Sequence, residues 1–171
     1  LLRKKTKLLG YQQHPYDALL NEYEQGATVD FLDRLFAKVK LALKQLIIVL
    51  NKEGEATDNA FLKKSFSKSK QWDFGLYLLK QMGFDFEAGR QDLSEHPFTT
   101  SFSANDVRVT TRIEKNNLLE MIGGCVHEGG HALYEMGLNP AQYGLPLGQA
   151  VSLGMHESQS RLWENHVGLS R

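Results

Sequence analysis

The chain has 171 residues, 42% of them apolar, and its 20 basic and 20 acidic side chains give a formal net charge of zero at pH 7. This size and composition predict one soluble domain over residues 1–171, and the balanced charge argues against nucleic acid and membrane lipid as partners. The lone Cys125 excludes a disulfide framework within the chain and favours a location in the reducing cytoplasm.

The first fifty residues predict two helices. The opening LLRKKTKLLG holds a basic cluster without a long apolar run, which argues against a signal peptide. Pro15 opens a short helix that runs to Glu24 and stops near Gly26. Thr28 is a suitable N-cap for a long amphipathic helix that continues to Asn51. We expect other helices to cover its apolar stripe, which consists of Phe31, Leu32, Leu35, Phe36, Val39, Leu43, Leu46, Ile47 and Leu50.

The next part of the chain predicts a loop and a third helix. Residues 51–59 are polar and contain a glycine, as loops do. A helix from about Ser69 is expected to bury Trp72 and Leu79 and to end at Gly83, which suits the position after a helix. Several lysines precede or open this helix, and a solvated helix face explains them better than a nucleic-acid surface does: Lys63, Lys64, Lys68 and Lys70.

From His96 the apolar period changes from helical to two, which predicts a β-hairpin within residues 96–114. The strands are residues 98–102 and 107–113, with Asn105-Asp106 as the turn. In the second strand one face is apolar or β-branched, and it consists of Val107, Val109, Thr111 and Ile113. The hairpin either offers an edge to an extended peptide or only caps the helical core, and the sequence favours neither.

Residues 116–137 carry the most informative pattern, His127-Glu128-Gly129-Gly130-His131. In a helix, His127 and His131 lie one turn apart, about 6 Å along the axis, so both imidazoles can reach one metal ion. Glu128 can then hold a water molecule rather than the metal, which is the H-E-x-x-H arrangement of metallopeptidases. The alternative is a pair of core histidines satisfied by hydrogen bonds.

A second helical pattern, residues 149–168, contains the candidate third ligand. Glu157 suits this role because a catalytic zinc takes three protein ligands and keeps one position open. The alternative is a surface ion pair between Glu157 and Arg161, four residues later. We expect the buried side of this helix to consist of Val151, Met155, Leu162 and Val167.

Further residues near the two patterns are candidates for orienting the ligands. His156 points about 100° away from Glu157 on the helix, so we expect it to orient a ligand or meet the substrate. Glu135 and Arg161 each lie four residues beyond a ligand and could hydrogen-bond to it, with surface pairing as the alternative. Cys125 is expected to be a buried thiol. Close approach of the second helix, or room for substrate, would justify the costly helical glycines Gly123, Gly124, Gly129 and Gly130.

Four motifs in this order resemble the M32 metallocarboxypeptidases, the thermostable carboxypeptidase family. They are His96-Pro97-Phe98, Asp106-Val107-Arg108-Val109-Thr110, the HEGGH segment and His156-Glu157-Ser158-Gln159. The resemblance also includes HPYDALL and GFDFEAGRQDLSEHPF and so covers essentially the whole chain. It implies a mainly α, gluzincin-like zinc peptidase with a small β-hairpin before the metal helix. It also implies zinc or cobalt as cofactor, a homodimer, and release of single residues from peptides with a free C-terminus.

The same resemblance assigns roles to individual residues and shows one departure. It implies His127, His131 and Glu157 as metal ligands and Glu128 as the catalytic carboxylate. Arg108 is our candidate for binding the substrate's terminal carboxylate, and an ion pair with Asp106 is the alternative. Two later family motifs, I-R-x-x-A-D and G-x-x-Q-D-x-H-W, do not occur, so we expect a partial catalytic domain of a longer chain whose C-terminal part would supply the oxyanion donor.

Two other classes of function stay open at this stage. A related gluzincin, either an endopeptidase or a carboxypeptidase that releases dipeptides, would share the same helix pair. A helical module that binds metal without turnover would also keep the motif. We divide the predicted domain into a helical region, 1–95, the hairpin, 96–114, and the metal-binding helix pair, 115–171.

Overall fold

The computed structural model of the chain describes residues 1–54 and 60–170. The chain divides into two compact units, Leu1–Asp58 and Asn59–Arg171, here called the N-terminal unit and the C-terminal unit. The prediction of a single domain over residues 1–171 stays a prediction. Among the described residues, none of the helices has both the length and the apolar character needed to cross a membrane.

The N-terminal unit consists of three helices, α1 (Leu2–Leu9), α2 (Asp17–Leu20) and α3 (Val29–Glu53). The helix predicted from Pro15 is shorter than expected and gives way to turns before Gly26, whose φ of 81° suits glycine. The N-cap prediction is confirmed, because the Thr28 hydroxyl accepts a hydrogen bond from the Phe31 amide at 3.2 Å. Helix α1 was not predicted. The loop expected at 51–59 begins later, since α3 continues through Glu53, and 55–59 lie outside the described residues.

The apolar stripe of α3 is not covered as we expected. None of the side chains of α3 is buried, and Phe36, for example, is 58% exposed. A helix of this length is about 37 Å long at 1.5 Å per residue, and α1 and α2 are too short to shield it. The apolar stripe therefore predicted the helix correctly, but it does not form a buried core within this unit.

The C-terminal unit contains a three-stranded sheet. It consists of β1 (Gly89–Leu93), β2 (Thr99–Ser103) and β3 (Asp106–Thr111), in the order β1-β3-β2. The predicted hairpin is confirmed, because β2 and β3 pair antiparallel. Strand β1, parallel to β3, was not predicted because its sequence lacks an apolar alternation. β3 is the central strand, so β2 and β1 form the edges.

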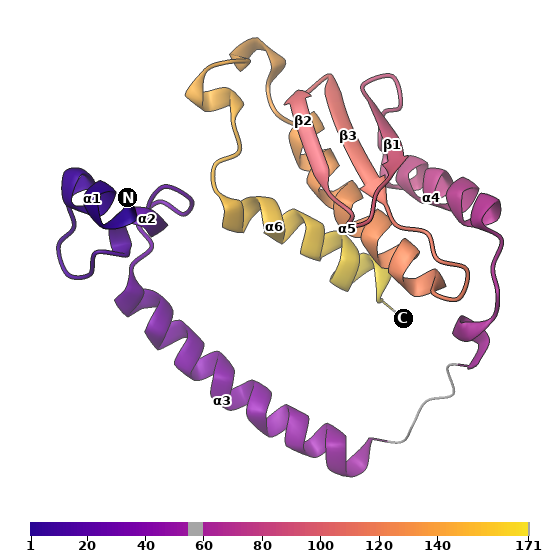
Figure 1. Ribbon diagram of the computed structural model, residues 1–171, viewed down its shortest axis with the longest axis horizontal. Coiled ribbons are helices and arrows are strands. Elements are labelled where there is room, and N and C mark those ends of the chain that lie inside the picture. Colours follow the sequence, from indigo (N-terminus) through magenta and orange to yellow (C-terminus); the bar gives the residue numbers. More distant parts are fainter. Residues whose placement is uncertain (55–59, 171) are drawn as a thin grey trace. The chain divides into compact units, whose positions relative to one another are not determined.

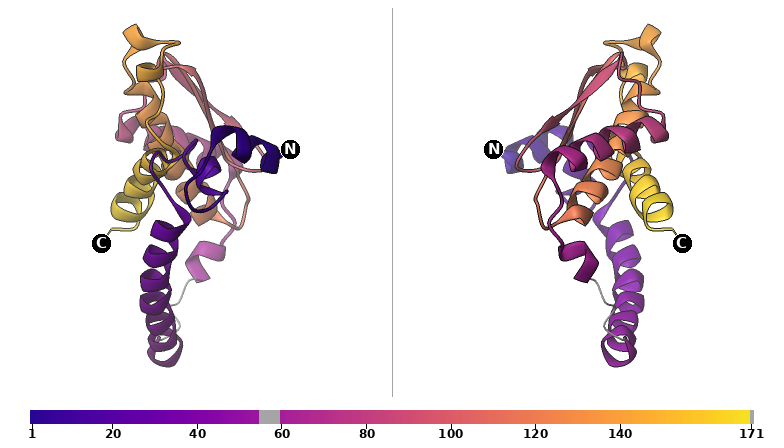
Figure 2. Two further views of the ribbon diagram at one scale, coloured as in Figure 1. Left: turned by 90° about the vertical axis from the view of Figure 1, so that its left-hand side faces the viewer. Right: turned by 90° about the vertical axis from the view of Figure 1, so that its right-hand side faces the viewer.

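Helix α5 (Leu118–Met136) is the centre of the C-terminal unit. It contacts α4 (Lys68–Met82), the strands β2 and β3, and α6 (Leu153–Arg161), which continues as the π-helix η4 (Leu162–Gly168). Figure 1 shows the sheet lying against α5, and the side views in Figure 2 show α5 between the strands and α6. Short 3-10 turns lie at Ala60–Lys63, Pro140–Gln142 and Pro146–Gly148. The core comprises Leu79, Phe84, Val107, Val109, Ile113, Met121, Cys125 and Ala132.

Two predictions about helices of this unit have different outcomes. Helix α4 ends as predicted at Gly83, which adopts the left-handed conformation with φ of 96°. The predicted buried side of the second metal helix is wrong: Val151, Met155, Leu162 and Val167 are between 45% and 72% exposed. The buried residue of α6 is Ser160, because the helix packs against the backbone of α5 and a small side chain permits the close approach.

Candidate metal centre

Helices α5 and α6 bring the three predicted ligands together. His127 and His131 lie one turn apart on α5, with ring centroids separated by 4.9 Å. The Oε2 atom of Glu157, from α6, lies 3.2 Å from Nε2 of His131 and 3.7 Å from Nε2 of His127. One ligand atom from each of the three residues lies within 4.8 Å of the others. The three side chains therefore converge on a common point.

The donor set and its spacing fit a divalent metal ion. Two imidazole nitrogens and one carboxylate oxygen are the ligands of many catalytic zinc sites. Ligand atoms at about 2 Å from a tetrahedral zinc lie about 3.3 Å from one another. The separations of 3.2 Å and 3.7 Å between Glu157 and the two histidines match this value. The site thus needs little rearrangement to hold a cation.

The other ring nitrogen of His127 is held by a carboxylate that the sequence analysis missed. Its Nδ1 lies 2.8 Å from Oε2 of Glu164, in η4. Arg161 joins this carboxylate to the metal ligand, because its Nε donates to Glu157 at 2.8 Å and its Nη1 donates to Glu164 at 3.0 Å. Glu164 lies seven residues after Glu157, two helical turns on the same face, and this spacing was the available signal.

The other ring nitrogen of His131 is held by His156. The Nδ1 atoms of the two rings lie 2.5 Å apart, and Nε2 of His156 lies 2.6 Å from Oε1 of Glu135. The position of Glu135, four residues after His131, had suggested a direct hydrogen bond to that ring. Instead, Glu135 contacts His156, and His156 contacts His131. Its other carboxylate oxygen accepts a hydrogen bond from Ser101 at 2.6 Å.

Glu128 is buried next to the ligands and does not join them. Its side chain is directed toward β2, where the Thr99 hydroxyl donates to Oε2 at 2.7 Å. The residue is 7% exposed, and this burial raises the pKa of the Glu128 carboxyl, although the Thr99 hydrogen bond opposes the rise. A carboxyl with a raised pKa exchanges protons more readily near neutral pH than an ordinary glutamate does.

The pKa shifts of two candidate ligands favour the forms that would bind a metal. Burial, together with the neighbouring His156, lowers the pKa of His131 and so favours the neutral imidazole. Burial opposes ionisation of Glu157, but hydrogen bonds from Arg161 and Ser160 outweigh it and lower the pKa of this carboxyl. A neutral imidazole and an ionised carboxylate are the forms that coordinate a cation.

The two inner glycines of the motif allow neighbouring helices to approach α5. A Cβ atom at Gly130 would lie 2.7 Å from the Cα of Ser160, in α6. A Cβ atom at Gly129 would lie 2.7 Å from the side chain of Met82, in α4. The approach of the second helix that we expected is therefore present at Gly130, and it brings Glu157 to the histidines. Gly123 has open space instead, with nothing within 4 Å of a Cβ atom.

Two other candidates lie apart from the ligand cluster. Arg108 is on the face of β3 opposite to the buried Val107 and Val109, and it pairs with Asp106 at 2.9 Å and stacks over Phe102. This is the ion pair that we kept as the alternative, so its substrate role stays a prediction. Cys125 is a buried thiol, as expected, and burial raises its pKa to about 12.

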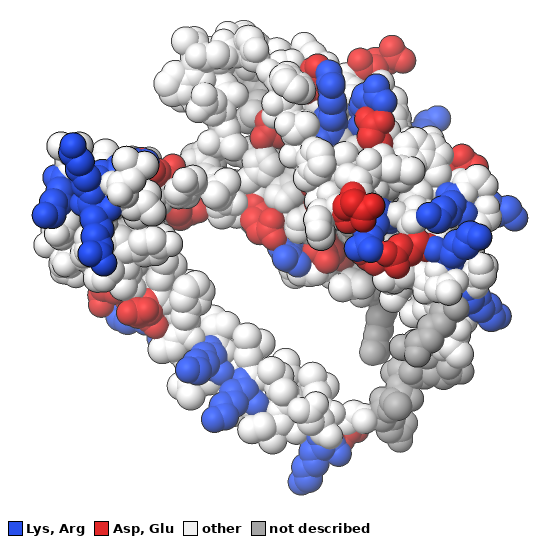
Figure 3. Space-filling model, in the orientation of Figure 1, with Lys and Arg blue, Asp and Glu red and all other residues white. Residues whose placement is uncertain are grey.

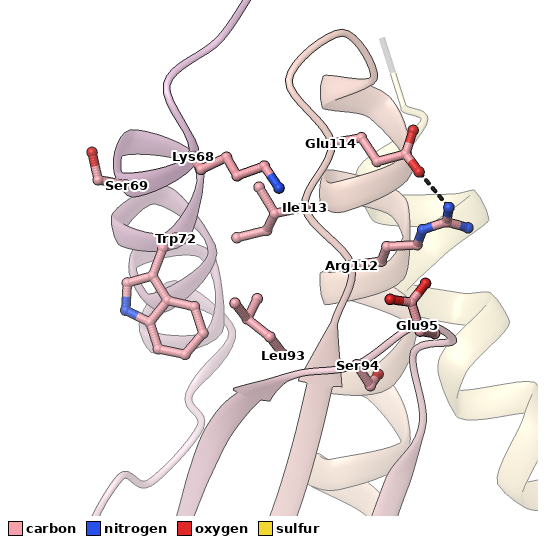
Figure 4. Close-up of a pocket in the computed structure, with 9 residues that line it drawn as sticks. All are labelled: Lys68, Ser69, Trp72, Leu93, Ser94, Glu95, Arg112, Ile113 and Glu114. Atoms are coloured by element: carbon pink, nitrogen blue, oxygen red, sulfur yellow. Dashed lines mark hydrogen bonds and ion pairs between the residues drawn. The ribbon is translucent and has the colours of Figure 1, made fainter.

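Two hollows in the described part of the C-terminal unit differ in how close they lie to the candidate metal centre. The larger, of about 700 Å³, lies between the start of α4 and the ends of β1 and β3, and Figure 4 shows Trp72, Lys68 and the ion pair of Arg112 with Glu114 around it. None of the three candidate metal ligands lines it. The smaller, of about 360 Å³, is lined by β2 and the loop after α5 and includes Ser101 and Glu135. This smaller hollow therefore lies beside Ser101 and Glu135, which are linked to His131 through His156.

Several proteins of known sequence or structure are similar to this chain over most of its length. Carboxypeptidase 1 of Bacillus subtilis (strain 168) is 44% identical over 162 residues, which are 95% of this chain and 32% of that protein. A solved structure, described as the structure of CHT, is 60% identical with a TM-score of 0.94 and covers 99% of this chain and 34% of its own. The crystal structure of the M32 carboxypeptidase from Deinococcus radiodurans R1 is 39% identical with a TM-score of 0.93, at 99% and 34% coverage.

The comparisons also show how much of this chain and of its relatives is covered. The chain spans about a third of the length of the curated relatives that it matches. The sequence model of one family, described as carboxypeptidase Taq (M32) metallopeptidase, matches all of residues 1–171. With its mainly helical fold and its candidate His-His-Glu metal site, the chain belongs to the M32 family of metallopeptidases.

Proposed function

We propose that this chain carries the metal centre of a metallocarboxypeptidase that removes single residues from the C-terminus of peptides. The observation that carries the proposal is the convergence of His127, His131 and Glu157 on one point, with Glu128 buried beside them. Membership of the M32 family supports the reaction class, and the relatives are named as carboxypeptidases. This support favours a carboxypeptidase over an endopeptidase, a dipeptide-releasing enzyme or a module without turnover.

The cofactor that we propose is zinc, with cobalt as the alternative. Nε2 of His127, Nε2 of His131 and Oε2 of Glu157 would hold it, because these are the atoms that face one another. When bound, a divalent cation would polarise the carbonyl of the scissile peptide bond and make a water molecule nucleophilic near neutral pH. Glu164, His156 and Arg161 keep the three ligands oriented through hydrogen bonds.

Glu128 is the residue that we propose to move the proton. As water attacks the carbonyl carbon, a carboxylate oxygen of Glu128 accepts the proton of that water, and it then delivers the proton to the nitrogen of the leaving amine. The raised pKa of the buried Glu128 carboxyl suits both steps better than an ordinary glutamate would. The hydroxyl of Thr99 holds the carboxylate in place at 2.7 Å.

For the substrate we propose a peptide with a free C-terminus. Arg108 is our candidate for its carboxylate, since a guanidinium can bind a carboxylate through two hydrogen bonds. In the structure this guanidinium already pairs with Asp106, so a substrate would have to replace that partner. The edge strand β2 is the place where an extended peptide could add main-chain hydrogen bonds.

Metal content tests the ligand assignment directly. We expect the purified chain to bind one zinc or cobalt ion, measured by equilibrium dialysis and elemental analysis. Glu157→Ala should lose most of this binding, because one of the three donors is gone. The matched control is Glu87→Ala, which removes an exposed carboxylate of the same unit. Equal metal content in the Glu157→Ala variant and the wild type would refute the assignment.

Peptide cleavage tests the reaction class and the role of Glu128. The whole protein should release single residues from a peptide with a free C-terminus and leave the amidated peptide intact. Glu128→Gln should keep the metal and lower kcat by about 100- to 10,000-fold, because proton transfer is lost. Cleavage of the amidated peptide at internal bonds would favour an endopeptidase instead.

We also propose that the whole protein is a cytoplasmic homodimer. The free, buried Cys125 suits a reducing compartment. The exposed apolar side chains of α3 are surface that a second copy of the chain could cover. Sedimentation analysis of the whole protein over a range of concentrations tests the dimer, and a monomer at all concentrations would refute it.

A further inference from the structure

The edge strand β2 supplies two hydroxyls to helix α5. Thr99 and Ser101 lie two residues apart, so their side chains are on the same face of the strand, and both are partly buried. Their hydroxyls bond to Glu128 and Glu135, which lie seven residues apart on α5. Thr100, between them, is exposed on the opposite face. One face of β2 therefore holds two carboxylates of the metal helix.

The contact of Ser101 continues through two more side chains to a metal ligand. Its Oγ donates to Oε2 of Glu135 at 2.6 Å, and Oε1 of the same carboxylate lies 2.6 Å from Nε2 of His156. Nδ1 of His156 then lies 2.5 Å from Nδ1 of His131. Four residues from β2, α5 and α6 thus form one chain of hydrogen bonds.

Ligation of a metal by His131 fixes the direction of every bond in this chain. If Nε2 of His131 donates its lone pair to the metal, its Nδ1 must carry the proton and donate it to Nδ1 of His156. Neutral His156 then carries its proton on Nε2 and donates it to Glu135, which also accepts from Ser101. Each donor meets an acceptor, and the chain ends on a carboxylate. Such an arrangement fixes the orientation of a ligating ring and increases its basicity.

We propose that Ser101 is a positioning residue for the metal ligand His131, acting through Glu135 and His156. This inference rests on the proposed function, because it takes His131 as a ligand. Ser101 touches neither the metal nor the ligand. It fixes the carboxylate of Glu135, which in turn holds the ring of His156 against His131. The edge strand of the sheet is thereby linked to the metal centre on the helix.

A surface hydroxyl that merely satisfies a neighbouring carboxylate would have a different consequence. Its removal would leave the two carboxylate oxygens of Glu135 free to rotate or to bind water, with no effect beyond that residue. In the chain described above, the second oxygen of Glu135 is already bound to His156, so rotation of the carboxylate would break that contact as well. Metal affinity therefore distinguishes a positioning role of Ser101 from a purely local one.

The first experiment measures zinc affinity by competition with a chromophoric chelator. Ser101→Ala should weaken zinc binding about tenfold, the lower end of the range for residues that orient metal ligands. Ser101→Thr keeps a hydroxyl and should restore the affinity to within about twofold of the wild type. Thr100→Val, on the opposite face of the same strand, is the matched control and should leave zinc affinity unchanged. Thermal unfolding of each metal-free variant checks that the fold is retained.

The second experiment is a double-mutant cycle on the same affinity. Glu135→Gln should weaken zinc binding by about tenfold or more, because an amide cannot accept from both Ser101 and His156 with the same strength. Adding Ser101→Ala to Glu135→Gln should cost less than about twofold, since Ser101 acts only through Glu135. Full additivity of the two losses would overturn the proposed route.

The outcomes also separate this inference from the proposed function. If the wild type binds zinc and loses it in Glu157→Ala, while Ser101→Ala binds as tightly as the wild type, the inference is wrong and the metal site stands. If the wild type binds no metal, both are wrong. The absorption spectrum of the cobalt form gives an independent readout, because Ser101→Ala should change it if the orientation of His131 changes, and Thr100→Val should not.

Discussion

Helices α3 and α5 have similar apolar patterns and opposite environments. Helix α3 has 25 residues and none of its side chains is buried, whereas α5 has 19 residues, seven of which are buried. Figure 3 shows uncharged surface along α3 between its lysines. The difference teaches that an apolar period identifies a helix but does not identify its partner. Burial requires neighbouring elements, and α5 has them on several sides within its own unit.

The residues that distinguish α5 are the small ones. Gly129 and Gly130 let α4 and α6 approach the backbone of α5, which also contacts β2, β3 and η4. Helix α3 contains no glycine, and at its start the Val29 amide donates a hydrogen bond to Asp17. In α5 two of the costly glycines, Gly129 and Gly130, thus mark the positions of close packing.

The largest expected difference between the two helices is in hydrogen exchange. Amides in the middle of α5 should be protected to the level of global unfolding, about 5 kcal/mol or more, which slows exchange by about a thousandfold or more. Amides in the middle of α3 should exchange much faster, since local opening of α3 exposes no buried side chain. Exchange measured by mass spectrometry on the chain at micromolar concentration tests this. Protection of α3 that rises with concentration would instead indicate a second copy covering its apolar stripe.

A pair of leucines sharpens the same comparison. Leu79→Ala should destabilise the C-terminal unit by about 2–5 kcal/mol, because the side chain of Leu79 is fully buried and a cavity would remain. Leu46→Ala, in α3, should change stability by less than about 0.5 kcal/mol, since Leu46 is 51% exposed. Chemical denaturation of both variants and the wild type gives the values. Equal losses for the two substitutions would mean that α3 has a core partner after all.

The sequence indicated the two candidate histidine ligands because their convergence depends on local spacing. His127 and His131 are one turn apart in any helix, and Glu157 was the fitting third donor on the next helical pattern. Thr28, Gly83 and the hairpin were predictable for the same reason, since caps and tight turns depend on neighbouring residues. These features need no knowledge of the tertiary structure.

The features that sequence analysis missed all depend on contacts between distant segments. Strand β1 has a polar sequence and is a strand only because β3 lies beside it in parallel. Ser101 is an unremarkable serine until Glu135 and His156 are placed next to it. The predicted buried side of the second metal helix was wrong because the prediction assumed an apolar contact. Ser160 and the backbone at Gly130 form the actual contact.

Two glycines of α5 test the importance of close approach. Gly130→Ala should cost about 1–3 kcal/mol of stability, because the new methyl group would overlap the backbone of α6 at Ser160 and Gln159. It should also weaken metal binding, since α6 carries Glu157. Gly123→Ala is the matched control and should stabilise the unit by about 0.5–1 kcal/mol, as the site is open and alanine favours helix. Thermal unfolding that gave the same sign for both would contradict this account of α5.

The smallest expected effects concern the two N-caps. Asn117 caps α5 through the Glu120 amide at 3.3 Å, and Thr28 caps α3 through the Phe31 amide at 3.2 Å. Asn117→Ala should cost the C-terminal unit about 1 kcal/mol, because the capped turn belongs to a helix that unfolds with its core. Thr28→Ala removes a similar bond, but α3 has no buried side chain, so it should reduce helical circular dichroism without shifting the cooperative transition. A shift as large as that of Asn117→Ala would show that α3 unfolds together with the core of the C-terminal unit.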